Sequence, residues 1–324
     1  MQLNPFSMIY HVPVMAQEIV EALRVNPGDT VVDATLGGGG HAAILGSLAG
    51  PNGVLIGIDR DTDALSEASG RLQAIGYELR PRIEYVHARY DRAFDEIRQR
   101  GFESVNAILF DLGVSSHQLD EPSRGFSFKD PSAPLDMRMD QSSGEQSAAD
   151  LLNELPEREL TRIFRDYADE RWAARIAQFV ADRRKGAPYA TAGQLTETIM
   201  AAIPAAARPK DIHPGTRVFQ ALRIAVNHEF EALELALRKA IDLLASGGRI
   251  AVLSYHSGED RIVKNSFAVL SGKCVCPPEY PACQCEAKAP KVSIVTRKPI
   301  GPESLEIANN PRARSAKLRI AERL

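Results

Sequence analysis

Four consecutive glycines, Gly37–Gly40, follow a short β-rich run and precede an apolar stretch with the composition of a helix. Glycine reaches positive φ without strain, and its lack of a Cβ lets the backbone approach a ligand closely. A helix that begins directly after such a loop offers free N–H groups and a partial positive charge, which suit a carboxylate as well as a phosphate. The arrangement therefore favours a ligand-binding loop over a merely flexible turn.

An acid stands at the end of the next apolar run. Asp59 closes the run Val54–Asp59 and lies 22 residues after Gly37. A carboxylate at this position accepts hydrogen bonds from the ribose of dinucleotides in nucleotide-binding folds, so it indicates a ligand that contains adenosine. The spacing Gly37-x-Gly39-x-x-Ala42 also fits the NAD-binding pattern, so the loop by itself leaves the cofactor open.

Two more acids favour S-adenosylmethionine over NAD. Asp33 precedes the glycines in an otherwise apolar run, where its carboxylate would attract a sulfonium or an amino group. Asp111 ends the fourth apolar run, where the transferred group of the ligand would lie. A dehydrogenase would more often place a His, Lys or Tyr pair to handle the hydride, and the sequence places no clear one. An NAD-linked oxidoreductase is therefore the weaker alternative.

The elements that would position these residues alternate between strand and helix. Strands are expected at 30–34, 54–59, 83–87 and 107–111, with helices from His41 onward and over 62–74 and 91–100. Strands separated by helices of this length form a parallel sheet with right-handed crossovers. The first third of the chain therefore predicts an α/β fold.

The alternation stops near Gly113. Residues 115–149 are rich in Ser, Gly, Pro and Asp and predict a long irregular loop. A helical period follows over 151–180, and Thr191 with Gln194 forms a capping box for a further helix. This segment predicts a helical domain inserted into the α/β core.

The α/β pattern then resumes. The sequence predicts one long helix over 217–245, a strand over 249–255 and a closing antiparallel pair over 292–297 and 316–320. We therefore expect a core made of residues 1–118 and 214–324, with an all-helical substrate-recognition domain over 119–213.

The composition is that of an ordinary globular protein, with 44% hydrophobic and 25% charged residues and a net charge of −3. The segment from Ala287 to the end departs from this balance, because it holds nine Lys or Arg against three Glu. It is either a solvated basic strand pair or a surface that contacts RNA. No apolar run approaches the ~18 residues of a membrane span, and residues 1–15 do not have the pattern of a signal peptide. We expect a cytoplasmic protein without a membrane partner.

All four cysteines fall in one short segment, as Cys274-x-Cys276 and Cys283-x-Cys285. Four thiolates could bind one structural zinc, although Cys-x-Cys is less usual in such sites than Cys-x-x-Cys. Reduced surface cysteines without a metal are the default interpretation, and both remain open at this stage.

Longer motifs span nearly the whole chain. They are His11–Val14, Asp33–His41, Asp111–Ser116, Gln118–Asp120, Arg124–Phe128, Pro134–Asp140, Thr216–Ile224, Glu259–Lys264 and Asn310–Arg319. In these motifs the sequence resembles the family of ribosomal RNA small subunit methyltransferases H, which methylate N4 of a cytosine in the decoding centre of 16S ribosomal RNA. Tyr255 and Gly258 depart from the resemblance, since the family usually has Phe and Leu there.

The resemblance implies a class I S-adenosylmethionine-dependent methyltransferase with a Rossmann-like core, an inserted helical domain and 16S ribosomal RNA of the small subunit as its partner. Whether the chain forms a homodimer stays open. The implied cofactor contacts are Gly39, Gly40, His41, Asp59, Tyr90, Asp111 and Gln118, to which the loop analysis adds Asp33 and Gly37.

Methylation of cytosine N4 needs a group that accepts its protons, because the lone pair of the amine is delocalised into the ring. Asp111, assisted by Ser115, is the catalytic candidate, and the alternative is that Asp111 only binds cofactor. Base capture and phosphate contact suggest a second set, formed by Arg124, Phe126, Arg138, Arg217, Tyr255 and His256. A catalytically idle RNA-binding protein with the same fold is the alternative outside the enzymes.

Overall fold

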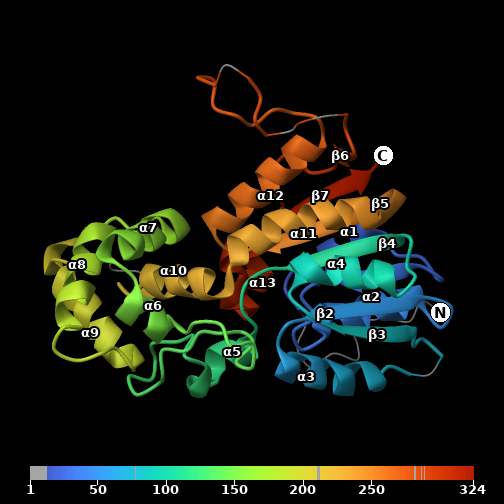
Figure 1. The fold of residues 1–324 in the computed structure, drawn as a ribbon. Helices are drawn as coiled ribbons and strands as arrows, with labels where there is room; N and C mark the ends of the chain where they lie inside the picture. The colour runs from blue at the N-terminus through green and yellow to red at the C-terminus, as the bar shows by residue number, and fades with distance from the viewer. Residues whose placement is uncertain (1–12, 77, 210–211, 281, 286, 288) are drawn as a thin grey trace. The chain divides into compact units, whose positions relative to one another are not determined.

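The computed structural model describes residues 13–324 except 77, 210–211, 281, 286 and 288 (Figure 1). His11 and Val12 of the first motif and Lys288 of the basic segment lie outside the described residues. Contacts along the backbone divide the chain into two compact units. Unit 1 comprises Met1–Gly113 and Phe230–Leu324, and unit 2 comprises Val114–Glu229.

Unit 1 is built on a seven-stranded sheet in the order β3-β2-β1-β4-β5-β7-β6. The strands are β1 (Thr30–Asp33), β2 (Val54–Asp59), β3 (Arg82–His87), β4 (Val105–Asp111), β5 (Leu244–Ser254), β6 (Val292–Ile294) and β7 (Lys317–Arg323). The first five strands are parallel, and β7 pairs antiparallel with both β5 and β6. The expected parallel sheet and its closing antiparallel pair are confirmed.

Helices cover both faces of this sheet (Figure 1). One buried core joins the sheet to α4 (Tyr90–Gln99), α11 (Glu229–Leu243) and α12 (Ser257–Leu270), and the other joins it to α1 (Ala16–Leu23), α2 (Gly40–Ala49) and α3 (Thr62–Gln73). The central strands read as continuous apolar runs because both of their faces are buried. The short α13 (Ser304–Asn309) and η4 (Pro311–Ser315) lead into β7.

The sheet order gathers three acids at one edge. Asp33, Asp59 and Asp111 are the last residues of β1, β2 and β4, and these three strands are neighbours. Parallel strands present their carboxyl ends at the same edge, which is where ligands bind in open α/β sheets. The crossover connections thus bring together groups that are far apart in the sequence.

The regular elements in the described part of unit 2 are helices, which surround an apolar core of their own. They are α5 (Ser116–Asp120), η2 (Pro122–Arg124), α6 (Ala148–Glu154), α7 (Glu157–Ala168), α8 (Ala173–Arg183), α9 (Ala192–Ala202), η3 (Ala205–Ala207) and α10 (Thr216–Asn227). The capping box of Thr191 and Gln194 at the start of α9 is present as predicted. The expected irregular loop over 115–149 is interrupted by α5 and η2.

The expected boundary at residue 213 differs from the division that the contacts give. The predicted single helix over 217–245 is wrong, because His228 takes a left-handed conformation (φ 51°) and separates α10 from α11. Val226 of α10 belongs to the core of unit 2, whereas Leu233 of α11 belongs to a core of unit 1. Each helix therefore packs against the core of a different unit. The helical period of the sequence continues through the break and does not indicate it.

Among the described residues, none of the helices combines the length and the apolarity that a bilayer crossing demands.

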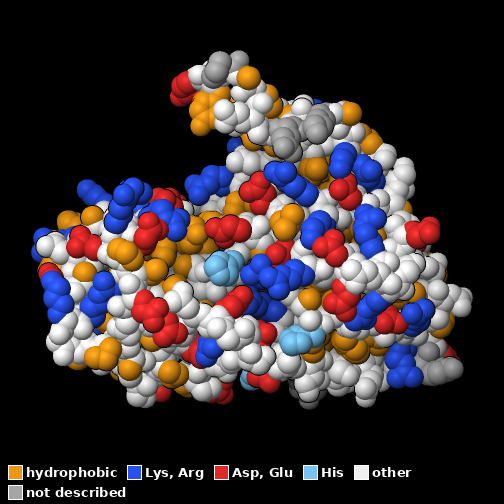
Figure 2. Space-filling model, viewed as in Figure 1, with side chains coloured by type: hydrophobic (Ala, Val, Ile, Leu, Met, Phe, Trp, Pro, Cys, Tyr) orange, Lys and Arg blue, Asp and Glu red, His pale blue; other side chains and the backbone are white. Residues whose placement is uncertain are grey.

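Basic and acidic side chains are intermixed on the face drawn in Figure 2. In the basic C-terminal segment, Arg319 is buried and pairs with Asp260 at 2.6 Å, so part of that positive charge serves the fold.

Candidate cofactor and active site

The glycine loop links β1 to α2 in unit 1. Gly37 and Gly39 have positive φ angles of 49° and 76°, and Gly39 is the N-cap of α2. A Cβ at Gly39 would lie 3.1 Å from the Cβ of Ala68, so this position requires glycine for its conformation and for its space. The loop ends at the open N-terminus of α2, where no side chain caps the helix. The predicted loop is thus preorganised by backbone geometry.

Asp59 is fixed beside this loop. Its Oδ2 accepts a hydrogen bond from the N–H of Gly37 at 2.8 Å, and its Oδ1 accepts one from the N–H of Asp61 at 2.9 Å. Burial raises the pKa of Asp59 above its usual value, while these N–H groups act in the opposite direction. Each carboxylate oxygen can accept a further hydrogen bond, which is what the two hydroxyls of a ribose require.

Asp33 ends β1, just before the loop, and is 1% exposed. Burial raises the pKa of its carboxyl to about 6, against the attraction of His41, and the neighbouring Asp111 and Asp59 raise it further. Its Oδ1 accepts a hydrogen bond from the N–H of Thr35 at 3.1 Å. A cation bound at this edge would relieve the repulsion among these carboxylates.

Asp111, at the end of β4, meets two side chains of unit 1. Its Oδ1 accepts a hydrogen bond from the hydroxyl of Tyr255 at 2.7 Å, and its Oδ2 lies 3.5 Å from Nε2 of His41. Burial, with the nearby Asp111 carboxylate second, raises the pKa of Tyr255 above its usual value, so the phenol remains a proton donor. His41 is 6% exposed, and its Nε2 has no hydrogen-bond partner among the described residues. A buried polar atom of this kind is expected to form a hydrogen bond with a ligand or a water.

Tyr90, Phe110 and Thr35 of unit 1 lie in or shortly after strands that carry the three acids or neighbour them in the sheet. Tyr90 begins α4 directly after β3, and its ring meets that of Phe110 edge-on at 5.8 Å. Thr35 was not predicted, yet its Oγ1 accepts a hydrogen bond from the N–H of Asp111 at 2.6 Å and ties the glycine loop to β4. Its position inside the Asp33–His41 motif was the only signal that could have identified it.

His256 has a capping function. Its Nδ1 accepts a hydrogen bond from the N–H of Glu259 at 3.3 Å, and Glu259 accepts from the N–H groups of His256 and Tyr255, which together form a capping box for α12. Glu259 was also missed by the sequence analysis as a member of this site, although its spacing from His256 is that of a capping box. The Glu259 carboxylate thereby fixes the backbone of Tyr255, whose hydroxyl reaches Asp111.

Ser115 and Gln118 lie in unit 2 and form a capping box of their own. Oγ of Ser115 accepts a hydrogen bond from the N–H of Gln118 at 3.2 Å, and Oε1 of Gln118 accepts one from the N–H of Ser115 at 3.0 Å. This exchange starts α5 immediately after the unit boundary. The catalytic role expected for Ser115 and the cofactor role expected for Gln118 stay predictions.

The four residues expected to contact RNA in unit 2 have different environments. Arg124 is 4% exposed and donates to the carbonyl of Met139 at 2.7 Å, and Phe126 is buried in the apolar core. Both have a structural role here, because neither side chain is accessible to a nucleic acid. Arg138 forms a bidentate pair with Asp136 at 2.8 and 2.9 Å, whereas Arg217 is exposed on α10. Arg217 is therefore the strongest of the four candidates.

The residues fit S-adenosylmethionine better than NAD. Three carboxylates converge on the edge where the glycine loop opens, and the pKa of Asp33 is raised by burial first and further by Asp111 and Asp59. A pyrophosphate would add negative charge to this edge, whereas a sulfonium and an ammonium would neutralise it. Asp59 suits the ribose, and the open N-terminus of α2 suits a carboxylate. The donor set matches a cationic ligand that contains adenosine.

The sheet order and this site define the class, an S-adenosylmethionine-dependent methyltransferase with a Rossmann-like core. The chain belongs to the MraW methylase family, whose model matches residues 8–324. Two curated relatives are called ribosomal RNA small subunit methyltransferase H. The protein from Symbiobacterium thermophilum is 48% identical over 97% of both chains. The protein from Heliobacterium modesticaldum is 48% identical over 98% of this chain and 99% of its own.

A solved structure of an rRNA methylase from Streptococcus thermophilus is also similar, at 14% identity and a TM-score of 0.40 over 100% of this chain and 99% of that one. The likeness is too low to carry an argument about function.

Proposed function

We propose that this chain transfers a methyl group from S-adenosylmethionine to N4 of a decoding-centre cytosine in 16S ribosomal RNA. The family and the names of the relatives support ribosomal RNA of the small subunit as the target. A cytoplasmic location, where ribosomal subunits are available, goes with this proposal. The choice of an exocyclic amine is carried by one observation, the Asp111 carboxylate held between Tyr255 and His41.

An amine substrate requires a hydrogen-bond acceptor at the reacting atom. The lone pair of N4 becomes nucleophilic only when the amino group leaves the plane of the ring, and a carboxylate that accepts its N–H groups favours that geometry. Asp111 supplies a carboxylate with one oxygen engaged by Tyr255 and the other 3.5 Å from His41. A hydroxyl substrate would call for a stronger base, so this arrangement favours an amine.

The residues of the chain have separate roles in this proposal. Asp59 and the glycine loop hold the adenosine and methionine ends of the cofactor, and Asp33 offsets its positive charge. The cofactor, when bound, supplies the electrophilic methyl group. Tyr255 keeps the Asp111 carboxylate in one orientation, and Asp111 accepts a proton from the amine as the methyl group is transferred. Alignment of the reacting atoms supplies much of the rate, because positioning is worth up to about 7–11 kcal/mol.

The reaction is tested on immature small ribosomal subunits. Subunits from cells that lack this protein are incubated with the enzyme and labelled S-adenosylmethionine, and the ribosomal RNA is digested and analysed by mass spectrometry. We expect N4-methylcytidine at a single decoding-centre position. A label on another nucleotide would refute the amine assignment, and the absence of any label would favour a catalytically idle RNA-binding protein.

Two substitutions separate the role of Asp111 from cofactor binding. Asp111→Asn should bind S-adenosylmethionine with similar affinity and lose turnover by about 100-fold or more, the usual size of an acid–base contribution. The matched control is Glu103→Gln, which makes the same chemical change at an exposed acid of the same unit. Full turnover by Asp111→Asn with normal cofactor binding would exclude the catalytic role.

A further inference from the structure

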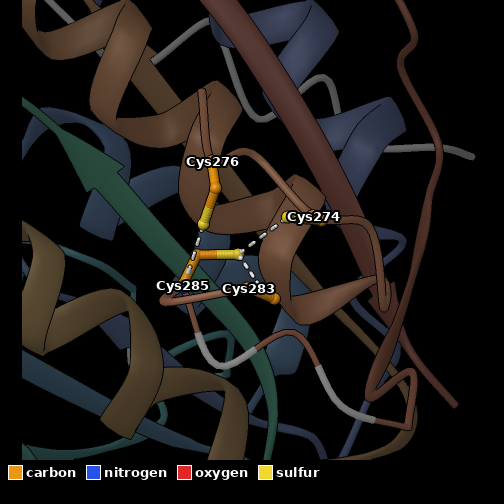
Figure 3. A group of neighbouring side chains, drawn as sticks. All are labelled: Cys274, Cys276, Cys283 and Cys285. Atoms are coloured by element: carbon orange, nitrogen blue, oxygen red, sulfur yellow. Dashed lines mark hydrogen bonds between the residues drawn. The ribbon is translucent and has the colours of Figure 1, made fainter. Parts of the chain in front are cut away.

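The four cysteines lie together in the segment between α12 and β6 (Figure 3). They are the only cysteines of the chain, and none of them forms a disulfide. Figure 3 shows the four side chains turned toward one another from two arms of the loop. The Cys274-x-Cys276 arm follows α12, and the Cys283-x-Cys285 arm returns toward β6. The cluster is separate from the three acids at the edge of the sheet.

The distances between the sulfur atoms are those of one tetrahedral centre. All four Sγ atoms lie within 4.8 Å of one another. Sγ of Cys285 is 3.4 Å from Sγ of Cys283 and 3.7 Å from Sγ of Cys274. Four ligands at a Zn–S bond length of ~2.3 Å in tetrahedral geometry leave sulfur atoms about 3.8 Å apart. A disulfide joins two sulfurs at ~2.0 Å, and Cys285 has two close neighbours rather than one.

Backbone N–H groups point at the sulfur atoms. Those of Gln284 and Cys285 each donate to Sγ of Cys276 at 3.2 Å, and that of Val275 donates to Sγ of Cys285 at 3.4 Å. All three bonds join one arm to the other. Because N–H donors offset negative charge, they favour sulfur atoms in the thiolate form that binds a metal.

Apolar packing contributes little to the described part of this segment. Val275 and Tyr280 are 37% and 48% exposed, and neither belongs to an apolar core of the described residues. Small segments without an apolar core are commonly held by a metal or by disulfides. A crosslink through the four sulfurs would stabilise this exposed loop, and the distances favour one centre over two pairs.

We propose that Cys274, Cys276, Cys283 and Cys285 bind one Zn²⁺ ion, which fixes the loop between α12 and β6. All four positions are filled by protein, as in structural sites, so the ion holds the loop and leaves methyl transfer to the other edge of the sheet. Four thiolates also accept iron, and metal analysis distinguishes the two ions.

The first test is the metal content of the full-length protein purified under reducing conditions without added chelator. We expect about one zinc per chain, no iron, and four thiols that react with Ellman's reagent only after the zinc is removed. Refilling with Co²⁺ should give the visible absorption bands of tetrahedral cobalt thiolate. A metal-free protein with four reactive thiols, a stoichiometric iron content, or two disulfides would each overturn the proposal.

The second test uses Cys283→Ser and its control, Glu279→Ser, which changes an exposed residue of the same loop. Cys283→Ser should lose most of the zinc and become sensitive to trypsin at the exposed Lys273, whereas Glu279→Ser should keep both properties. Both variants should bind S-adenosylmethionine normally, because the cysteines lie outside the cofactor site, and that result shows that unit 1 has folded. Retention of a full equivalent of zinc by Cys283→Ser would contradict a four-cysteine site.

Discussion

The hydroxyl of Tyr255 donates a hydrogen bond to Oδ1 of Asp111 at 2.7 Å, across the ends of two neighbouring parallel strands. Asp111 closes β4, and Tyr255 directly follows β5. The phenol therefore occupies one carboxylate oxygen and leaves the other facing His41. The proposed proton acceptor is thereby held in one rotamer before a substrate binds.

Tyr255→Phe should lower kcat by less than about tenfold, because it removes the group that orients Asp111 and leaves the carboxylate in place. The free energy of unfolding should fall by about 1.5–3 kcal/mol, the range for a hydrogen bond to a charged group. Steady-state kinetics and urea unfolding measure the two effects.

The control is Tyr189→Phe, which removes another buried phenol bond, to Thr198 at 2.7 Å in unit 2. It should lower stability without changing kcat. If Tyr255→Phe and Tyr189→Phe changed kcat equally, Tyr255 would have no special role in positioning Asp111.

Asp33→Asn should change the pH dependence of stability. The pKa of Asp33 is raised from 3.8 to about 6 in the folded state, so the stability that it contributes is complete below pH ~4 and is lost as the pH rises through 6. The asparagine of the variant does not titrate, so the variant does not lose this stability as the pH rises. Relative to wild type it should therefore gain about 3 kcal/mol between pH 4 and 7.5, since one pKa unit corresponds to ~1.4 kcal/mol. Parallel stability curves of the two proteins would show that Asp33 does not titrate in this range.

Asp59→Ala should weaken the binding of S-adenosylmethionine by about 10- to 100-fold, because hydrogen bonds from a ribose to a charged group are worth about 1.5–3 kcal/mol. Isothermal titration calorimetry measures this directly. The affinity for S-adenosylhomocysteine, which has the same ribose and no sulfonium charge, should fall by the same factor. A loss confined to S-adenosylmethionine would mean that Asp59 acts through charge alone.

Gly39→Ala should destabilise the protein by about 1–3 kcal/mol, because φ is 76° at this position and the new Cβ would meet Ala68 at 3.1 Å. Gly70→Ala is the matched control, since Gly70 lies inside α3 with open space around its Cβ position and should gain about 0.5–1 kcal/mol. Thermal unfolding of both variants gives the comparison. Equal shifts would mean that the loop tolerates a side chain.

The strands and the three acids at their ends were predictable, because buried parallel strands are continuous apolar runs and Asp33, Asp59 and Asp111 terminate them. The turn at His228 was not, because the helical pattern continues through it and only the two separate cores require the break.

The site was only partly predictable for a related reason. The type of a residue shows its charge but not whether its side chain is buried. The sequence therefore suggested Arg124 as a phosphate ligand, although its side chain is buried and donates a hydrogen bond to the carbonyl of Met139. The contact between Tyr255 and Asp111 joins residues that are 144 positions apart, and no local pattern signals it. The pairing becomes visible only when β4 and β5 lie side by side.

The strand order also constrains how the protein is made. β7 lies between β5 and β6 and follows both of them in the chain, so the sheet stays incomplete until β7 has been synthesised. Until it arrives, β5 has an unpaired edge of the kind that promotes aggregation. A chain that stalls before Lys317 cannot hide that edge, and we expect it to be recognised as unfinished by chaperones and proteases. Synthesis of β7 is thus a condition for joining β6 to the rest of the sheet.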